Sequence, residues 1–248
     1  MTTQEFSSQF DTLINAYNMQ ANHGNSFQPL EFDEYEKSVF LTLAQEEVVI
    51  SLYSGNGISN SFESTEEVRR YLANLTRTLF IDTEKTEGGN PALMKGVISR
   101  SAVFPTDIGK ELLYIVQESI QLPDSDDPCL SGKVVEVVPI THDTYNRIMK
   151  NPFRRPSNKK AFRLDLDKNK VEILYSMDTP FKYWARYLTK PKPIVLTNLR
   201  EGLSINGERE ISQCELHNML HRVILETAVR MAVSSRSIGS SKDAKPKE

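Results

Sequence analysis

The chain has 248 residues, with 30 Lys and Arg against 33 Asp and Glu, and this net charge of −3 excludes a nucleic-acid binder that acts through its overall charge. A composition that is 39% hydrophobic and 25% charged excludes a disordered chain and fits one large or two small packed domains. Cys129 and Cys214 alone do not form a disulfide framework, which indicates a reducing compartment.

The first segments carry no signal for export or membrane insertion. The N-terminus lacks a basic region and an apolar core, and no apolar run approaches the roughly 20 residues that span a bilayer. We therefore expect a soluble protein without a membrane partner, made in the cytosol.

Apolar spacing predicts that the first third is helical. A short amphipathic helix is expected over residues 3–17, and a second helix over 32–53 has apolar residues on more than one stripe, which is typical of a helix packed between neighbours or subunits. The pair Ser64 and Glu67 is a capping box that predicts a third helix near 65–79.

The middle of the chain changes to strand-like patterns. Runs rich in Val, Ile and Tyr predict several strands, and residues 167–170 form the turn of a hairpin. A short helix is expected over 143–150. The predicted strands cover residues 97–104, 112–122, 133–140, 162–166 and 171–175.

The run from Phe181 to Leu199 holds the only tryptophan and a Lys-Pro-Lys-Pro break. Proline has no backbone donor and fixes φ, so this part of the strand is expected at a sheet edge or a bend. An edge rich in aromatic side chains suits contact with another protein. The predicted oligomer or partner contacts are Trp184, Tyr183, Arg186, Tyr187, Pro191 and Pro193.

A second capping box, Ser212 with Glu215, predicts a long amphipathic helix over residues 213–233. The whole pattern predicts an α+β fold, in which N-terminal helices and the long C-terminal helix form an α-helical bundle with an inserted, mainly antiparallel β domain. The expected parts are a helical region 1–80, a β-rich domain 81–210, the helix 211–234 that completes the bundle, and a flexible tail 235–248.

Two patterns resemble metal sites. Cys214, His217 and His221 would share one face of the last helix and could bind zinc, but a structural zinc needs a fourth ligand, for which His142 is the remaining candidate. The second pattern, Asp165, Asp167 and Asn169, starts like a calcium loop but lacks the required Gly and Glu. We therefore expect no metal or cofactor, and the sequence contains no phosphate loop or nucleophile elbow.

A basic loop follows the short helix and could contact DNA phosphates or an acidic partner, or could simply be solvated. The candidate contact residues are Lys150, Arg154, Arg155, Lys159 and Lys160.

Several stretches together resemble virion structural proteins of crAss-like tailed bacteriophages. They are FDEYEKSVFLTLAQEEVVISLYS at 32–54, EVVPITHDTYNRIMKNPFRRP at 136–156, YWARYLTKPKPIVLTNL at 183–199 and CELHNMLHRVILETAVRMA at 214–232. The last two are also similar to the end of the head-to-tail connector proteins called adaptor, ring or tail tubular proteins.

The resemblance implies a structural, non-enzymatic component of the virion, made in the bacterial host cytoplasm. It implies a ring of twelve copies beneath the portal protein that extends the channel for genomic DNA and docks further tail or ring proteins. Two alternatives remain open from the residues alone: a metal-dependent phage enzyme that uses Cys214, His217 and His221, and a scaffolding or DNA-binding accessory absent from the virion.

Overall fold

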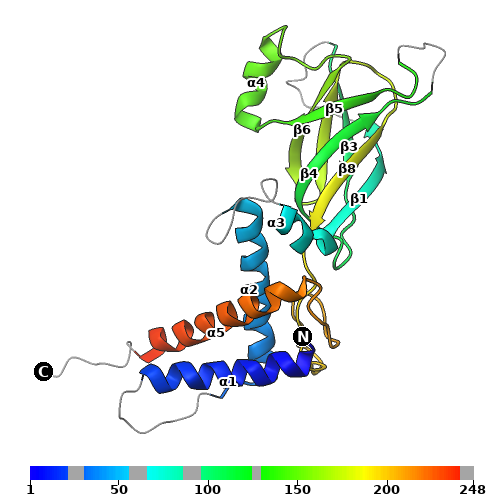
Figure 1. Ribbon diagram of the computed structural model, residues 1–248. Helices are drawn as coiled ribbons and strands as arrows, with labels where there is room; N and C mark the ends of the chain where they lie inside the picture. The colour runs from blue at the N-terminus through cyan, green and yellow to red at the C-terminus, as the bar shows by residue number, and fades with distance from the viewer. Residues whose placement is uncertain (22–30, 56–65, 86–95, 125–129, 241–248) are drawn as a thin grey trace, which may run out of the picture. The chain divides into compact units, whose positions relative to one another are not determined.

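The computed structural model of the chain describes residues 1–21, 31–55, 66–85, 96–124 and 130–240 (Figure 1). Two compact units are present. The sheet unit comprises residues 76–190, and the terminal unit comprises residues 1–75 together with 191–248.

The sheet unit is built on one eight-stranded sheet with the order β1-β8-β4-β5-β6-β7-β3-β2. Most neighbouring strands are antiparallel, but β5 and β6 pair in parallel and are joined by the helix α4 (His142–Lys150). The strands are β1 (Thr76–Asp82), β2 (Glu84–Lys85), β3 (Ile98–Val103), β4 (Leu112–Gln121), β5 (Val134–Pro139), β6 (Lys160–Asp167), β7 (Lys170–Tyr175) and β8 (Lys182–Thr189).

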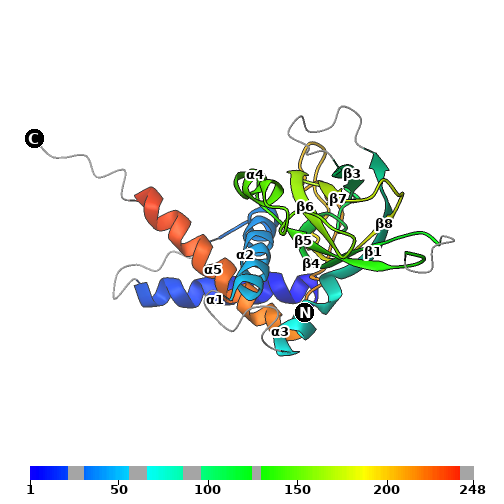
Figure 2. The same ribbon diagram turned by 90° about the horizontal axis from the view of Figure 1, so that it is seen from above.

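The sheet is strongly curled, so that its strands surround a common core (Figure 2). Its two edge strands, β1 and β2, follow each other in the chain with Thr83 between them. The Thr83 hydroxyl donates a hydrogen bond of 2.6 Å to the carbonyl oxygen of Phe181. The curl brings the two edges of the sheet together at this point.

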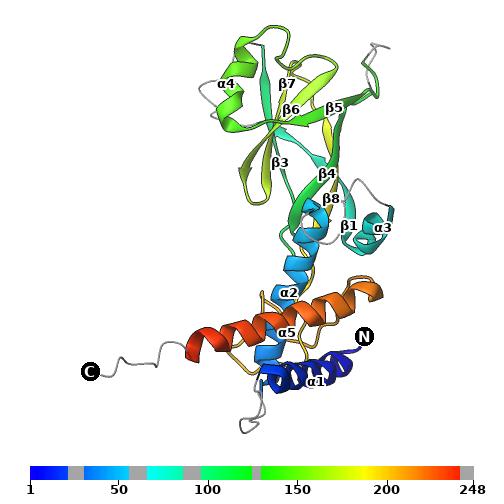
Figure 3. The ribbon, with the colours of Figure 1, turned by 60° about the vertical axis from the view of Figure 1, so that its left-hand side comes forward.

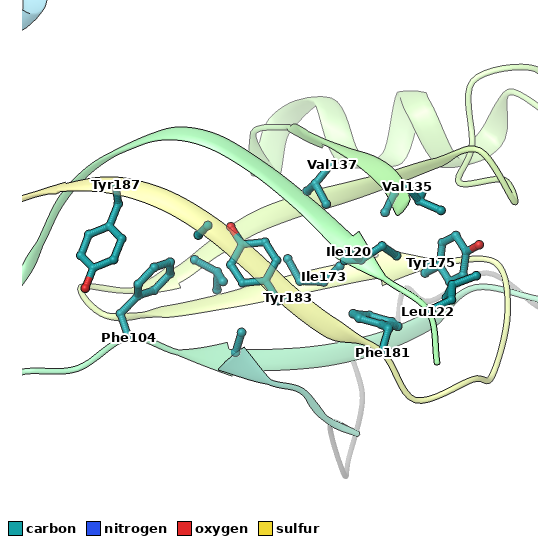
Figure 4. Packing of buried hydrophobic residues seen from close by; sticks show 14 residues of the cluster. Phe104, Ile120, Leu122, Val135, Val137, Ile173, Tyr175, Phe181, Tyr183 and Tyr187 are labelled. Carbon is teal, nitrogen blue, oxygen red and sulfur yellow. The ribbon is translucent and has the colours of Figure 1, made fainter. Parts of the chain in front are cut away.

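The core inside the curled sheet is rich in aromatic rings (Figure 4). Phe104 meets Tyr183 and Tyr187 edge to face, with ring centroids 6.1 and 5.2 Å apart. Tyr175 and Phe181 form a similar pair at 5.9 Å. Edge-to-face pairs add to the free energy gained by burying the rings, so these aromatics anchor the sheet.

A second, smaller core lies under α4. Tyr145 and Met149 are one turn apart on this helix and are buried with Phe162, Leu164 and Leu174 from the sheet. Another contact ties the start of the helix to β6, because His142 Nε2 donates to the carbonyl oxygen of Asp165 over 2.8 Å.

The terminal unit contains three longer helices that contact one another, as Figures 1 and 3 show. A buried lysine fixes the first to the second: Lys37 Nζ lies 2.7 Å from Asp11 and 3.0 Å from Glu34. Burial lowers the pKa of Lys37, but hydrogen bonds to Asp11 and Glu34 outweigh it and the pKa is raised. The helical elements are α1 (Thr3–Ala21), α2 (Glu34–Ser54), α3 (Glu66–Tyr71), the short 3₁₀ helix η1 (Ala73–Leu75) and α5 (Asn218–Ser240).

An extended segment over residues 191–196 runs along α2 and explains the proline pair. Three polar side chains on one face of α2 hydrogen-bond its backbone: Ser38 Oγ accepts from Leu196 N, Thr42 Oγ1 accepts from Ile194 N, and Gln45 Nε2 donates to Lys192 O. On its other edge, Val195 exchanges two 3.0 Å backbone bonds with Ser212.

Pro191 and Pro193 are buried in this segment. Since proline has no N–H group, neither residue leaves a buried donor that needs a partner. The Lys-Pro-Lys-Pro break is therefore suited to an extended chain that α2 holds through alternate residues.

The expected fold class is wrong. The structure is a mixed α/β fold dominated by one curled eight-stranded sheet with few helices, rather than an α-helical bundle carrying an inserted, mainly antiparallel β domain. The periodicity over residues 65–79 was misleading, because that stretch contains the short α3, η1 and the start of β1. Between Pro191 and Asn218 the chain is irregular and contributes buried Ile194, Val195 and Leu216 to the core.

Two local expectations are also corrected. β8 lies between β1 and β4, so it is a central strand rather than an edge strand, and the prolines follow it in the extended segment that α2 holds. The last helix begins at Asn218, so Ser212 and Glu215 do not cap it, and Ser212 pairs with Val195 instead. Ser64 of the other proposed capping box lies outside the described residues.

Other local predictions are confirmed. The helices expected at 3–17, 32–53 and 143–150 correspond to α1, α2 and α4. The hairpin of β6 and β7 turns over Lys168 and Asn169.

Candidate interaction surfaces

The basic loop predicted from the sequence forms one wall of a groove in the sheet unit. The groove has a volume of about 770 Å³ and lies between α4, the turn that follows it, and strands β5 and β6. Its apolar lining includes Val138, Ile140, Ile148, Pro152 and Phe162. Its cationic lining consists of Arg147, Arg154, Arg155 and Lys160.

Short-range hydrogen bonds shape the turn that carries these cations. Asn151 ends α4 and accepts backbone bonds from Arg154 and Arg155 at 3.0 and 3.1 Å. Its side-chain oxygen also accepts from the N–H of Phe153 over 3.0 Å, which forms an Asx turn. The two arginines are thus presented by a hydrogen-bonded turn.

The cations of the turn have no acidic partners among the described residues. None of the ion pairs found there involves Arg154, Arg155, Lys159 or Lys160. Lys160 Nζ instead lies 5.3 Å from the centre of the Phe162 ring, which is a cation–π contact. The groove lining therefore carries a net positive charge, since its four cations outnumber its one acid, Asp165, which lies 3.2 Å from Arg163 Nε.

Phe153 is an exposed aromatic residue in the turn that carries the arginines. Its side chain is 97% exposed, and it lines the groove together with Arg154 and Arg155. Exposed aromatic side chains beside arginine are typical of the centre of protein–protein contacts. Sequence reasoning placed Phe153 in the basic loop but did not single it out, and it missed Arg147, which α4 brings to the same groove.

The residues predicted as partner contacts on β8 point to two sides of the sheet. Tyr183 and Tyr187 are buried in the aromatic core, whereas Arg186 is exposed and Trp184 is half-buried on the opposite face. Arg186 lies over the Trp184 ring at 5.6 Å. On the neighbouring strand, Phe80 pairs with Trp184 and is 57% exposed.

The three residues of the proposed zinc pattern do not all lie on the last helix. Because α5 begins at Asn218, Cys214 and His217 precede the helix, and the three side chains do not form a group that could hold a metal ion. His221 is buried, and its Nε2 donates to the carbonyl oxygen of Leu216 over 3.1 Å. Burial raises the pKa of the Cys214 thiol to about 11, which disfavours the thiolate that binds metal.

Within the described ranges, no group of three or more His, Cys, Asp or Glu side chains is arranged to hold a metal ion. The calcium-like residues Asp167 and Asn169 belong to the hairpin between β6 and β7. Among the residues that the structure describes, no helix combines the length and the apolar character needed to cross a membrane.

Comparison with known proteins identifies the class to which this fold belongs. The chain matches the family model of the phage tail ring protein 3/4 over residues 1–244, so it belongs to that family of phage tail structural proteins.

Two relatives come from Bacteroides phage crAss001. The chain is 42% identical to its Ring protein 3 over 241 residues, which covers 96% of this chain and 97% of that protein. It is 29% identical to Ring protein 4/5 of the same phage, covering 94% of this chain and 92% of that protein. The resemblance to crAss-like phage virion proteins is thereby confirmed.

Proposed function

We propose that the protein assembles with copies of itself into a ring of the phage tail, and that this ring is a head-to-tail connector beneath the portal protein. The single observation that carries the proposal is the family match over residues 1–244, which spans both structural units. The stronger similarity to Ring protein 3 than to Ring protein 4/5 favours a role that corresponds to the former.

Similarity to two differently named ring proteins of one phage supports a stack of related rings. In such a stack, each chain needs one surface for its neighbours in the ring and another for the next ring. We propose that these two contact surfaces are the groove beside α4 and the outer face of β8, which carries Trp184 and Arg186. We propose twelve copies that surround a channel for genomic DNA and dock further tail proteins.

The role is structural rather than enzymatic. The relatives are named as ring proteins. Of the side chains proposed for a catalytic metal site, His221 is hydrogen-bonded to a backbone carbonyl and the Cys214 thiol is held protonated by burial. The functional surfaces are accordingly contact surfaces.

The test is to image virions and the purified chain by electron microscopy. We expect the chain in a closed ring of the tail of mature particles, adjoining the portal and enclosing DNA. Mass spectrometry of purified virions gives its copy number relative to the portal. Absence of the chain from mature virions would contradict the proposal and would favour a scaffolding role.

A further inference from the structure

Two segments of the chain have opposite and unusually one-sided charge. Residues 144–162 carry six cations and no acid, and they supply the basic wall of the groove. Residues 31–54, which include α2, carry six acids and one cation. That cation, Lys37, is buried against Asp11 and Glu34, so the solvent-facing charge of this segment is negative.

The outward face of α2 is also apolar. Leu43 and Ile50 are 48% and 46% exposed, and the exposed Glu47 lies between them. The spacing i, i+4, i+7 places the three side chains along one line of the helix. The opposite face of α2 is already occupied by Ser38, Thr42 and Gln45, which hold the extended segment.

The groove beside α4 complements this line of side chains. It has an apolar lining and a cationic rim, with Phe153 fully outside the core. A surface that presents apolar side chains beside carboxylates would bury the lining and pair with the arginines. A DNA backbone would satisfy the cations but would leave Phe153 and the apolar lining without a matching surface.

We propose that the outward face of α2, carrying Leu43, Glu47 and Ile50, docks into the α4 groove of the adjacent copy. This inference rests on the proposed ring. Since the two surfaces are different, the contact is heterologous, and repeating it around an axis gives a ring when the rotation closes. Phe153 is the apolar anchor of the groove, and Arg154 and Arg155 are the partners of the acidic helix.

The charges can be exchanged to test this pairing. The groove variant Arg154→Glu/Arg155→Glu and the helix variant Glu47→Lys should each assemble poorly, with at least about tenfold more protein needed for half-assembly. An equimolar mixture of the two variants should assemble again, because each contact in an alternating ring is then either native or fully exchanged. Assembly is measured by mass photometry and electron microscopy, alone and on purified phage heads that carry the portal.

Neutral variants test the apolar part of the contact. Phe153→Ser and Ile50→Ser should each weaken assembly, whereas Lys110→Glu, at an exposed site outside both surfaces, should not. Circular dichroism and thermal melting should match those of the wild type for every variant, since all the altered side chains are exposed.

The possible failures point to different conclusions. If the groove variant assembles normally but particles lose DNA, the groove binds phosphate and the inference is wrong. If the mixture does not restore assembly, α2 is not the partner of the groove. If wild-type rings form and none of the variants affects them, the ring stands and this contact is excluded. If the wild type forms no ring under any of these conditions, the proposed function itself fails.

Discussion

The two units of the molecule satisfy their buried backbone in different ways. In the sheet unit, strands pair with strands, and β8 is hydrogen-bonded to a neighbour on each side. In the terminal unit, the extended segment 191–196 is paired largely with side chains, since Ser38, Thr42 and Gln45 of α2 replace a partner strand. The first arrangement depends on register, whereas the second depends on the identity of a few polar residues.

Their buried charges differ as well. In the sheet unit, Glu118 and Arg163 are both deeply buried and lie 3.4 Å apart, and the Tyr183 hydroxyl donates to Glu118 over 2.6 Å. In the terminal unit, Lys37 is buried, but its partners Asp11 and Glu34 remain about 40% exposed. Breaking a charge pair should therefore cost more in the sheet than between the helices.

Among the charge pairs, the largest effect is expected when Arg163 is removed. Arg163→Ala leaves the Glu118 carboxylate buried without its cation, and this should lower the free energy of unfolding by about 3–5 kcal/mol. Chemical denaturation of the full chain measures the change. The matched variant is Lys37→Ala. It should lower the free energy of unfolding clearly less, because the carboxylates that lose their cation, Asp11 and Glu34, are partly exposed to solvent.

A double variant shows whether the loss of stability in Arg163→Ala arises from the unpaired Glu118 carboxylate. Glu118→Gln/Arg163→Met removes both charges and keeps an acceptor for the Tyr183 hydroxyl, so much of the stability lost in Arg163→Ala should return. The Arg163 Nε and Nη1 atoms make no well-aligned hydrogen bond within the described residues, so the pair depends on charge proximity. Equal losses in both variants would show that packing dominates instead.

A smaller effect than that of Arg163→Ala is expected from the α2 side chains that replace a partner strand. Thr42→Val keeps the side-chain volume but removes the oxygen that accepts from the buried N–H of Ile194 over 3.1 Å. An unsatisfied buried donor costs about 1–3 kcal/mol, and denaturation should show a loss of that size. Thr42→Ser keeps the hydroxyl and is the control. If the valine variant were the more stable of the two, side-chain pairing would not be what holds residues 191–196.

These contrasts also explain what the sequence could predict. Runs rich in Val, Ile and Tyr located β3, β4 and β5 well, alternation and a turn located the hairpin of β6 and β7, and helical spacing located α1 and α2, because all these patterns are local. The central position of β8 was missed, because its outward Lys182 and Arg186 and the following prolines resemble an edge strand. Strand order is set by long-range pairing, which local periodicity does not contain.

The basic surface was partly visible in the sequence. A run of cations around Arg154 and Arg155 is a local signal, and the loop was identified from it. The groove itself was not predictable, because Val138 and Phe162 reach it only through the parallel pairing of β5 and β6. The polar stripe of α2 was equally hidden, since its partner lies about 150 residues further along the chain.

A smaller effect is expected from pH, again in the sheet unit. Burial raises the pKa of Glu118 above its ordinary value, outweighing the opposing effects of Arg163 and the Tyr183 hydrogen bond. The folded state therefore binds this proton more tightly than the unfolded state. Stability from this group is full below the ordinary pKa and falls as pH rises from there to the raised value, by about 1.4 kcal/mol for each unit of elevation.

Glu118→Gln isolates that dependence. The difference in unfolding free energy between wild type and variant, measured across the acidic and neutral range, should shift against the wild type as pH rises through this window. Other titrating groups cancel in the difference. A difference that is flat with pH would show that Glu118 titrates normally in the folded protein.

The smallest effect on stability is expected on the outer face of the sheet. Arg186 is exposed and makes one cation–π contact with Trp184, so Arg186→Ala should change the unfolding free energy by no more than about 1 kcal/mol. Its buried neighbour offers the matched comparison, because Tyr187→Ala empties part of the aromatic core and should cost about 3–5 kcal/mol.

If the outer face of β8 is a contact surface, substitutions of its exposed side chains should affect assembly more than they affect stability. Arg186→Ala and Trp184→Ala would then lower the incorporation of the chain into tails while leaving its thermal melting close to that of the wild type. Quantitative mass spectrometry of virions assembled with each variant measures incorporation. Normal incorporation of both would assign this face of the sheet to solvent, and the α4 groove would remain the contact surface of the sheet unit.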